Sequence, residues 1–262
     1  MSAGPPVALV TGAASGIGAA TALAFAAQGY RVGVNYRSRA GAARDVAEAC
    51  RAAGGEGAAL PGDVAQDADC RRMLDDDADR WGRLDVLVNN AGMTRPAAPG
   101  DLDALQAEDF AAVFAVNVTG AWQMTRAAVP LLRAARGGVV NVSSHAGASG
   151  VGSSAAYAAS KGALNTLTLS LARQLAPDIR VNAVCPGFVD TDWMAAWVPG
   201  AQIDAFKRTT ADAAPLKRLV TPGDVAEAIV WLARAPAITG QHIVIDAGTH
   251  LTVGGPIPER SQ

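Results

Sequence analysis

Three side chains with complementary proton chemistry lie close together in the sequence: Ser144, Tyr157 and Lys161. Tyr157 and Lys161 are four residues apart at the start of an apolar-periodic segment, so on a helix they share one face. A lysine ammonium beside a phenol favours the phenolate, so we expect the pKa of Tyr157 to fall below about 10. Such a tyrosine can give or take a proton near neutral pH. A solvent-exposed pair on a helix would show the same spacing. The rest of the chain must therefore show whether Tyr157 and Lys161 belong to an active site or to the surface.

Strand-like and helix-like segments alternate along the chain. Strands are expected at Val7–Val10, Arg31–Tyr36, Gly57–Pro61, Leu84–Val88, Gly138–Ser143, Arg180–Val184 and Gln241–Ile245. Helices are expected from the first glycines to Gln28 and at Ala40–Ala53, Asp67–Trp81, Leu102–Phe114, Val118–Arg136, Ala155–Leu175 and Pro222–Ala235, with Asp190–Thr210 irregular or helical. This order predicts one α/β domain, a doubly wound parallel sheet of about seven strands with helices on both faces.

The composition narrows the class of protein. Of the 262 residues half are hydrophobic, and the formal charge is −2 with charges scattered, so we expect neither nucleic acid nor a membrane as partner. No apolar run is long enough to span a bilayer, and the N-terminal residues show no basic region or cleavage site, so we expect no targeting segment. Three unclustered cysteines indicate reduced thiols and a cytoplasmic protein, and the three histidines lack metal-ligand spacing.

A glycine turn follows the first strand, with Gly12, Gly16 and Gly18 in the spacing Gly-x-x-x-Gly-x-Gly. Glycines at a strand-to-helix junction let the backbone approach a pyrophosphate at the helix N-terminus, although an ordinary turn can also be glycine-rich. In a doubly wound sheet the ligand binds beyond the carboxyl ends of the strands. Asp63, Asn90 and Ser144 also follow expected strands, so we place a nucleotide site and the Tyr157 chemistry at one sheet edge.

The chain resembles the short-chain dehydrogenase/reductase family over about residues 7–248. The resemblance rests on Thr11-Gly-x-x-x-Gly-Ile-Gly18, Asp63-Val64, Asn89-Asn-Ala-Gly92, Asn117, Ser144, Tyr157-x-x-x-Lys161, and Pro186-Gly187 with Thr191. It implies a single Rossmann-type domain over residues 1–262 and an NAD(P)-dependent oxidoreductase that acts on CH–OH groups.

The resemblance also implies roles for individual residues. Tyr157 is the general acid or base, Ser144 polarises the substrate oxygen, and Lys161 holds the nicotinamide ribose and lowers the Tyr157 pKa. Asn117 corresponds to an asparagine whose backbone carbonyl holds a water leading to Lys161. The expected cofactor-binding residues are Gly12, Ser15, Gly16, Ile17, Gly18, Arg37, Ser38, Asp63, Val64, Asn90, Ala91, Gly92, Tyr157, Lys161, Pro186, Gly187, Val189 and Thr191.

The end of the second strand indicates which cofactor is used. An NAD site needs a carboxylate about twenty residues beyond the glycines, but no Asp or Glu precedes Asp45. Arg37 can pair with a 2′-phosphate and Ser38 can add a hydrogen bond. We therefore expect NADP(H) to be preferred, with NAD(H) also usable. The alternative is that Arg37 and Arg39 are only a solvated helix entrance.

The segment after Pro186-Gly187 resembles the family's substrate lid, here about residues 188–212. Residues expected to line an apolar substrate pocket are Met93, His145, Phe188, Trp193 and Trp197. The favoured substrate is a ketone or secondary alcohol with an apolar part, which makes the protein a carbonyl reductase or alcohol dehydrogenase. The alternatives are a 3-oxoacyl-[acyl-carrier-protein] reductase, a glucose or sugar-alcohol dehydrogenase, and a nucleotide-sensing protein without chemistry.

Assembly is inferred from the relatives. Helices 118–136 and 155–175 are rich in Ala and Leu, and relatives use this pair and the last strand as interfaces, so we expect a homotetramer or homodimer. Arg126, Arg133 and Arg136 either form a carrier-protein docking patch or are a solvated face. Ala247 stands where the family usually has glycine, a change expected to be harmless. The tail, residues 252–262, is expected to be flexible or to reach a neighbouring subunit.

Overall fold

Seven parallel strands form one sheet in the order β3-β2-β1-β4-β5-β6-β7 in the computed structural model, which describes residues 4–98, 100–196 and 200–252. The strands are β1 Val7–Val10, β2 Arg31–Tyr36, β3 Glu56–Pro61, β4 Val86–Asn89, β5 Gly138–Val142, β6 Arg180–Pro186 and β7 His242–Ile245. The order reverses between β1 and β4, where the chain crosses from one half of the sheet to the other. The predicted doubly wound α/β fold is confirmed.

Alternating side chains of the central strands enter two apolar cores. Ala8 and Val10 belong to one core, and Val7 and Leu9 to the other, as the two-residue period of a strand requires. All four residues are completely buried. A strand covered on both faces must be apolar at every position, which explains why β1 reads as a continuous apolar run and not as an alternating one.

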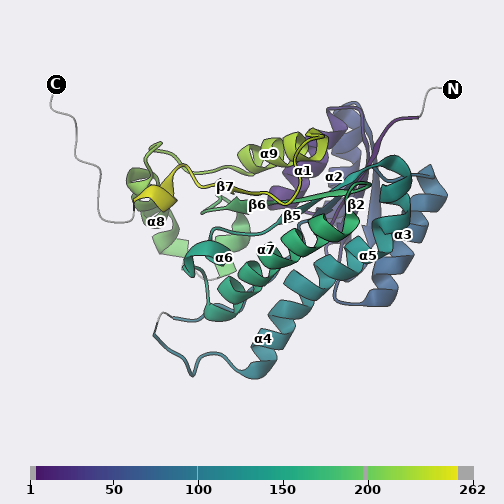
Figure 1. Ribbon diagram of the computed structural model, residues 1–262. Helices are drawn as coiled ribbons and strands as arrows, with labels where there is room; N and C mark the ends of the chain where they lie inside the picture. The colour runs from purple at the N-terminus through teal and green to yellow at the C-terminus, as the bar shows by residue number, and fades with distance from the viewer. Residues whose placement is uncertain (1–3, 99, 197–199, 253–262) are drawn as a thin grey trace.

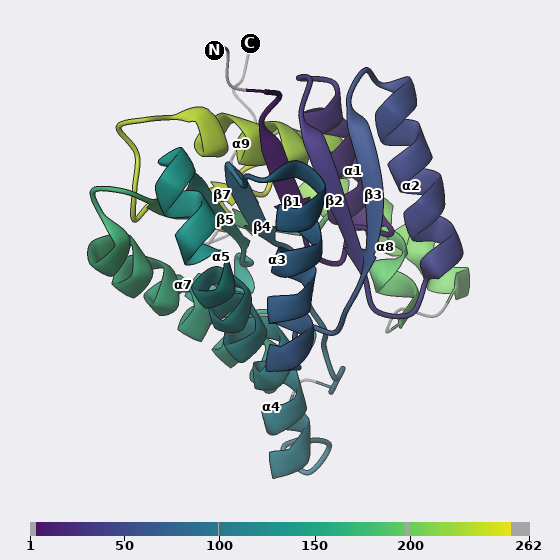
Figure 2. The same ribbon diagram turned by 90° about the vertical axis from the view of Figure 1, so that its right-hand side faces the viewer.

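Helices cover both faces of the sheet (Figures 1 and 2). The core built around Ala8 and Val10 packs under α1 Gly16–Ala26, α2 Ala40–Ala52 and α9 Pro222–Arg234. The core built around Val7 and Leu9 packs under α3 Asp67–Trp81, α5 Ala121–Ala135 and α7 Ala155–Leu175. The smaller elements are α4 Ala107–Phe114, η1 Ala115–Gly120, α6 Ala146–Ser149, η2 Asp192–Ala196, α8 Gly200–Ala213 and η3 Thr249–Leu251.

Two helix starts differ from the sequence prediction by three residues or more. The helix expected from Leu102 begins at Ala107, because the Asp109 carboxylate accepts a hydrogen bond from the Gln106 backbone N–H (3.1 Å) and so fixes the N-terminus there. The helix expected from Val118 is preceded by the π-helix η1, which contains Asn117. Wide turns of this kind are often found at functional sites.

None of the helices among the described residues is long and apolar enough to cross a membrane.

Candidate active site

One cavity of about 970 Å³ lies beyond the carboxyl ends of the central strands. Its lining includes these predicted site residues: Gly12, Ser15, Gly16, Ile17, Arg37, Ser38, Asp63, Val64, Asn90, Ala91, Gly92, Met93, Ser144, His145, Tyr157, Lys161, Pro186, Gly187, Phe188, Val189, Thr191 and Trp193. Gly18 and Asn117 do not line the cavity, but each lies against a residue that does: Gly18 packs against Asn90, and Asn117 accepts a hydrogen bond from Met93. Trp197 lies outside the described residues. Segments far apart in the sequence therefore meet around a single space.

Helix α7 positions Tyr157 and Lys161. Its N-terminus is fixed by Ser154, whose hydroxyl accepts a hydrogen bond from the Tyr157 backbone N–H (3.2 Å). Tyr157 is half-buried against the cavity, and Lys161, one turn later, is 4% exposed. The Lys161 Nζ donates to the Val142 carbonyl at the end of β5 (2.8 Å) and lies 5.6 Å from the Tyr157 ring centroid. The predicted juxtaposition of phenol and ammonium is present.

The expected direction of the Tyr157 pKa is wrong for this structure. Burial raises the pKa of Tyr157 above its usual value, and the Ser144 hydroxyl only partly offsets this. Burial also lowers the pKa of the Lys161 ammonium, to about 8. Burial therefore favours the neutral phenol, which is the form that carries the proton a carbonyl oxygen needs.

Asn117 acts on the site through the backbone around it. Its side-chain oxygen accepts from the Met93 N–H (2.8 Å), and its Nδ2 donates to the Met93 carbonyl (3.0 Å) and to Ser160 Oγ (2.9 Å). Ser160 in turn donates to the Tyr157 carbonyl (2.7 Å). The side chain therefore ties the loop after β4 to the catalytic turn of α7. The role expected for its backbone carbonyl stays a prediction.

The glycine turn has the geometry of an anion site. Gly12 and Gly16 adopt φ of +62° and +54°, which strongly favours glycine. A Cβ on Gly18 would lie 2.5 Å from Asn90 Nδ2 and 2.6 Å from the Gly12 carbonyl. The first turn of α1 has no acidic residue, and the Ser15 side chain does not cap it. Gly16 and Ile17, at this N-terminus, line the cavity, and a helix N-terminus in this place fits the pyrophosphate of a dinucleotide.

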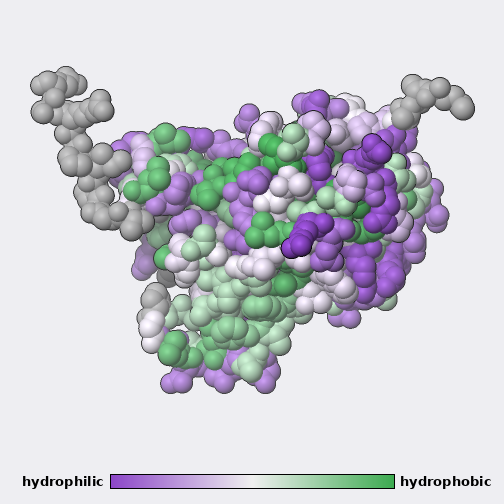
Figure 3. Space-filling view, viewed as in Figure 1, coloured by the Kyte–Doolittle hydropathy of each residue, from purple (hydrophilic) through white to green (hydrophobic). Residues whose placement is uncertain are grey.

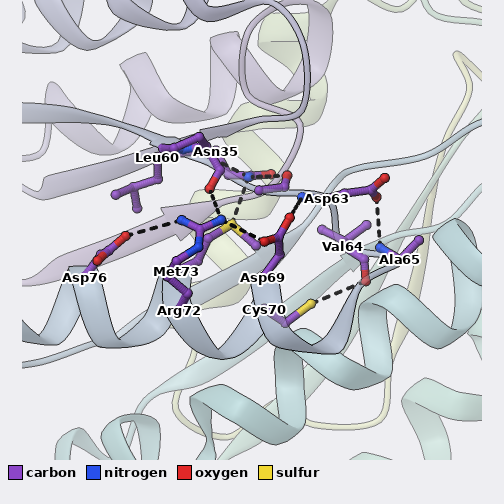
Figure 4. A network of polar contacts seen from close by, with 12 residues as sticks. Asn35, Leu60, Asp63, Val64, Ala65, Asp69, Cys70, Arg72, Met73 and Asp76 are labelled. Atoms are coloured by element: carbon purple, nitrogen blue, oxygen red, sulfur yellow. Dashed lines mark hydrogen bonds and ion pairs between the residues drawn. The ribbon is translucent and has the colours of Figure 1, made fainter.

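Asn35 is a residue of the site that the sequence analysis missed. Its Oδ1 accepts from the Gly12 N–H (3.0 Å), and its Nδ2 donates to the carbonyls of Leu60 (3.2 Å) and Gly62 (3.0 Å). Figure 4 shows it among the ends of β2 and β3, next to the turn that carries Asp63. This 2%-exposed amide joins the glycine turn to the neighbouring strands. The sequence signal that could have identified Asn35 is its position as a polar residue next to the apolar residues of β2.

The end of β2 forms a basic edge of the cavity. Tyr36, Arg37, Ser38 and Arg39 all line it. Arg37 Nη1 lies 3.9 Å from an Asp63 carboxylate oxygen, and Arg39 donates to Ser15 Oγ in the glycine turn. Arg39, which the sequence left as a solvated alternative, therefore bridges the two parts of the cofactor region. No carboxylate stands at the Tyr36 position where an NAD site would need one.

Aromatic side chains from the segment after β6 line the end of the cavity where the substrate is expected, called the substrate end below. The ring centroids of Trp193 and Tyr157 are 6.4 Å apart. Phe188 packs edge-on against Phe206, with the ring centroids 5.2 Å apart. Lys207 on α8 forms an ion pair with Asp190 (2.5 Å). Lining residues that the sequence analysis did not place here include Val151, Ser153, Asp192, Phe206 and Thr249. Met194, which the sequence analysis did not name, also lines the cavity.

Comparison with known proteins agrees with this arrangement of a dinucleotide fold and a Ser-Tyr-Lys site. A family model described as enoyl-(acyl carrier protein) reductase matches residues 12–250. A Streptomyces violaceoruber protein named as ketoacyl reductase 2 of the granaticin polyketide synthase is 46% identical, covering 94% of this chain and 96% of that one. A 3-oxoacyl-[acyl-carrier-protein] reductase of Synechocystis sp. is 40% identical, covering 92% and 96%.

A crystal structure of a short-chain dehydrogenase/reductase from Burkholderia xenovorans superposes with a TM-score of 0.88, at 48% identity, covering 95% of this chain and 100% of that one. The class defined by fold and site is an NAD(P)-dependent oxidoreductase that acts on CH–OH or keto groups. The chain belongs to the short-chain dehydrogenase/reductase family.

Proposed function

We propose that this protein reduces a 3-oxoacyl thioester to the 3-hydroxyacyl product with NADPH. The observation that carries the proposal is the convergence of Ser144, Tyr157 and Lys161 on the cavity that also holds the glycine turn. The names of the relatives at 46% and 40% identity favour ketoacyl reduction over the general carbonyl reductase that the sequence suggested first. A simple ketone remains a chemically competent substrate for the same residues.

The bound cofactor supplies the hydride, and the protein supplies position and a proton. Ser144 is placed to donate a hydrogen bond to the ketone oxygen and stabilise its developing negative charge. Tyr157, held neutral by burial, then donates its proton to that oxygen. Lys161 stabilises the resulting phenolate and is placed to hold the cofactor ribose. Because the pKa of Lys161 is about 8, this support is lost as the pH rises through that value.

The preference for NADPH is supported by the basic edge at Arg37 and Arg39. Both guanidinium groups lie at the cavity beside Ser38, where a 2′-phosphate would need charge and donors. Replacing Tyr36 by Asp and Arg37 by Leu should move the preference toward NADH by placing a carboxylate at the ribose. A wild-type preference of tenfold or more for NADH in a fluorescence titration would overturn this assignment.

The arginines Arg126, Arg133 and Arg136 were one possible docking patch for a carrier protein. Arg126 is ion-paired with Asp67 and Arg133 with Asp178 (3.2 Å), so two of the three arginines of the suspected docking patch already have intramolecular partners. We therefore do not assign carrier-protein docking to them.

The proposed assembly is a homotetramer or homodimer through the apolar surface over α4 and α7 (Figure 3). Phe110, Trp122 and Leu169, on α4, α5 and α7, are exposed on these helices. Sedimentation equilibrium would measure the assembly. The cytoplasmic location remains a prediction that a fluorescent fusion would test.

The function is tested by NADPH consumption with matched compounds. Acetoacetyl thioesters should be reduced with a higher kcat/KM than aryl ketones, glucose or polyols. Crotonyl thioester serves as the enoyl arm, because the matching family model is described by that activity. Faster turnover of the crotonyl thioester, or no turnover of the acetoacetyl thioester, would contradict the proposal.

A further inference from the structure

The substrate end of the cavity contains one imidazole for which the proposed function has no use. His145 follows Ser144 directly, and its side chain lines the cavity. Much of the remaining lining there is apolar, from Phe188, Trp193 and Met194. A bound substrate would cover the imidazole of His145. The imidazole then needs a hydrogen-bond partner on the substrate, because burying a polar group without a partner costs free energy.

The ring of His145 is held so that one nitrogen is left for a ligand. The His145 backbone N–H donates to the Pro186 carbonyl (2.8 Å), which fixes the residue at the start of α6. Its Nδ1 lies 3.5 Å from Ser149 Oγ. The same hydroxyl donates to the His145 carbonyl (3.1 Å), so its contact with Nδ1 does not fix the tautomer of the neutral ring. Nε2 has no hydrogen-bond partner among the described residues, and it is a donor in one neutral tautomer and in the protonated ring.

A second histidine limits how far that ring can move. The ring of His250 lies 6.3 Å from the ring of His145, tilted by 48°. His250 is itself fixed, because its Nδ1 pairs with the buried carboxylate of Asp246 (2.9 Å), and the same carboxylate accepts from the His250 backbone N–H (2.8 Å). Thr249, between them in the chain, lines the cavity. The ring of His145 therefore lies beside a ring that is itself held in place.

We infer that His145 is a specificity-determining residue that donates a hydrogen bond to a second substrate oxygen, the thioester carbonyl two carbons from the ketone. This inference rests on the proposed function and names the feature of the substrate that is recognised. Ser144 and His145 are consecutive and both line the cavity, so each can meet one oxygen of a 1,3-dicarbonyl unit. Asp192 also lines the cavity, which favours a neutral carbonyl over a carboxylate at this position.

The test compares two substrates in four proteins. The substrates are the acetoacetyl thioester of N-acetylcysteamine and the methyl ketone in which a methylene replaces the thioester carbonyl. The proteins are the wild type, His145→Phe, His145→Gln and the control His242→Gln, whose parent ring is hydrogen-bonded to the Asn165 carbonyl outside the cavity lining. Phenylalanine keeps a ring without a donor, and glutamine keeps a donor.

His145→Phe should lower kcat/KM for the thioester by about 3- to 10-fold, mainly through KM, and leave the ketone within about twofold. His145→Gln should recover most of the loss, and His242→Gln should match the wild type. Calorimetric titration with the 3-hydroxybutyryl thioester should show the same loss of affinity in His145→Phe.

Two results would overturn the inference alone: an equal loss with both substrates, or no loss with either. A wild type that turns over the ketone but not the thioester, or neither compound, overturns the proposed function and this inference with it.

Discussion

The cofactor end and the substrate end of the cavity are built differently. The cofactor end comes from the sheet: β1 is completely buried, and Asn35 ties the glycine turn to β3 through hydrogen bonds. The substrate end comes from the segment after β6, where α8 has no buried residue and Trp193 is 42% exposed. Strong packing fixes the first region and leaves the second adjustable, so cofactor geometry can be retained while substrate preference changes.

The largest effect is expected from replacing Tyr157, which we propose acts where the cofactor end and the substrate end of the cavity adjoin. Tyr157→Phe removes the proton donor and should lower kcat by about 10²- to 10⁴-fold, because general acid catalysis contributes that much. NADPH affinity, measured by fluorescence, should fall much less than kcat, since phenylalanine keeps the ring and loses only the hydroxyl. Undiminished reductase activity would remove Tyr157 from the mechanism.

A buried carboxyl lies outside the cavity lining, on the helix α3. Asp77 on α3 is completely buried, and neither of its oxygens has a hydrogen-bond partner among the described residues. Burial raises the pKa of Asp77 to about 7. Between about pH 4 and pH 7 the folded protein holds a proton that the unfolded chain has lost, so the free energy of unfolding should fall as the pH rises through this window.

Asp77→Asn should remove that pH dependence. The variant should be more stable than the wild type by roughly 2–4 kcal/mol at pH 8 and not at pH 4, as measured by urea unfolding. Asp79→Asn, an exposed neighbour on the same helix, is the control and should leave the slope intact. Equal slopes in Asp77→Asn and the wild type would show that the buried carboxyl is not the cause.

A smaller effect probes how tightly the cofactor end is packed. Gly18→Ala places a methyl group 2.5 Å from Asn90 Nδ2 and 2.6 Å from the Gly12 carbonyl. We expect a loss of about 1–3 kcal/mol in stability together with weaker NADPH binding. Gly41→Ala on α2, where an added Cβ meets nothing within 4 Å, should be neutral or slightly stabilising. If the two variants behave alike in thermal unfolding, the turn is less rigid than the contacts imply.

The smallest effect lies at the border between the two ends, in the turn after β7. Ala247 adopts a φ of +55°, so the alanine expected to be harmless sits in a left-handed conformation that costs roughly 1–2 kcal/mol. Glycine removes this strain but adds freedom to the unfolded chain. Ala247→Gly should therefore stabilise by about 1 kcal/mol or less in urea unfolding, with kcat unchanged. A destabilised variant would contradict the strain.

Much of the fold could be predicted because the signals are local. The helix Ala155–Leu175 and the strand Arg31–Tyr36 have the bounds that the sequence predicted, since apolar periodicity and turn residues lie within the segments themselves. The cavity lining also follows largely from order alone, because parallel strands bring their carboxyl ends to one edge. The boundary at Ala107 was missed because the Asp109 side chain, not periodicity, sets it.

The sequence by itself determined the sheet, the glycine turn and the spacing of Tyr157 and Lys161, each of which depends on near neighbours in the chain. Only the tertiary structure decided the direction of the Tyr157 pKa, because desolvation comes from atoms that distant strands and the segment after β6 bring around the ring. It likewise placed Asn35 under the glycine turn and His250 beside His145. Contacts between segments far apart in the chain leave no periodic pattern in the sequence, so only the tertiary structure shows them.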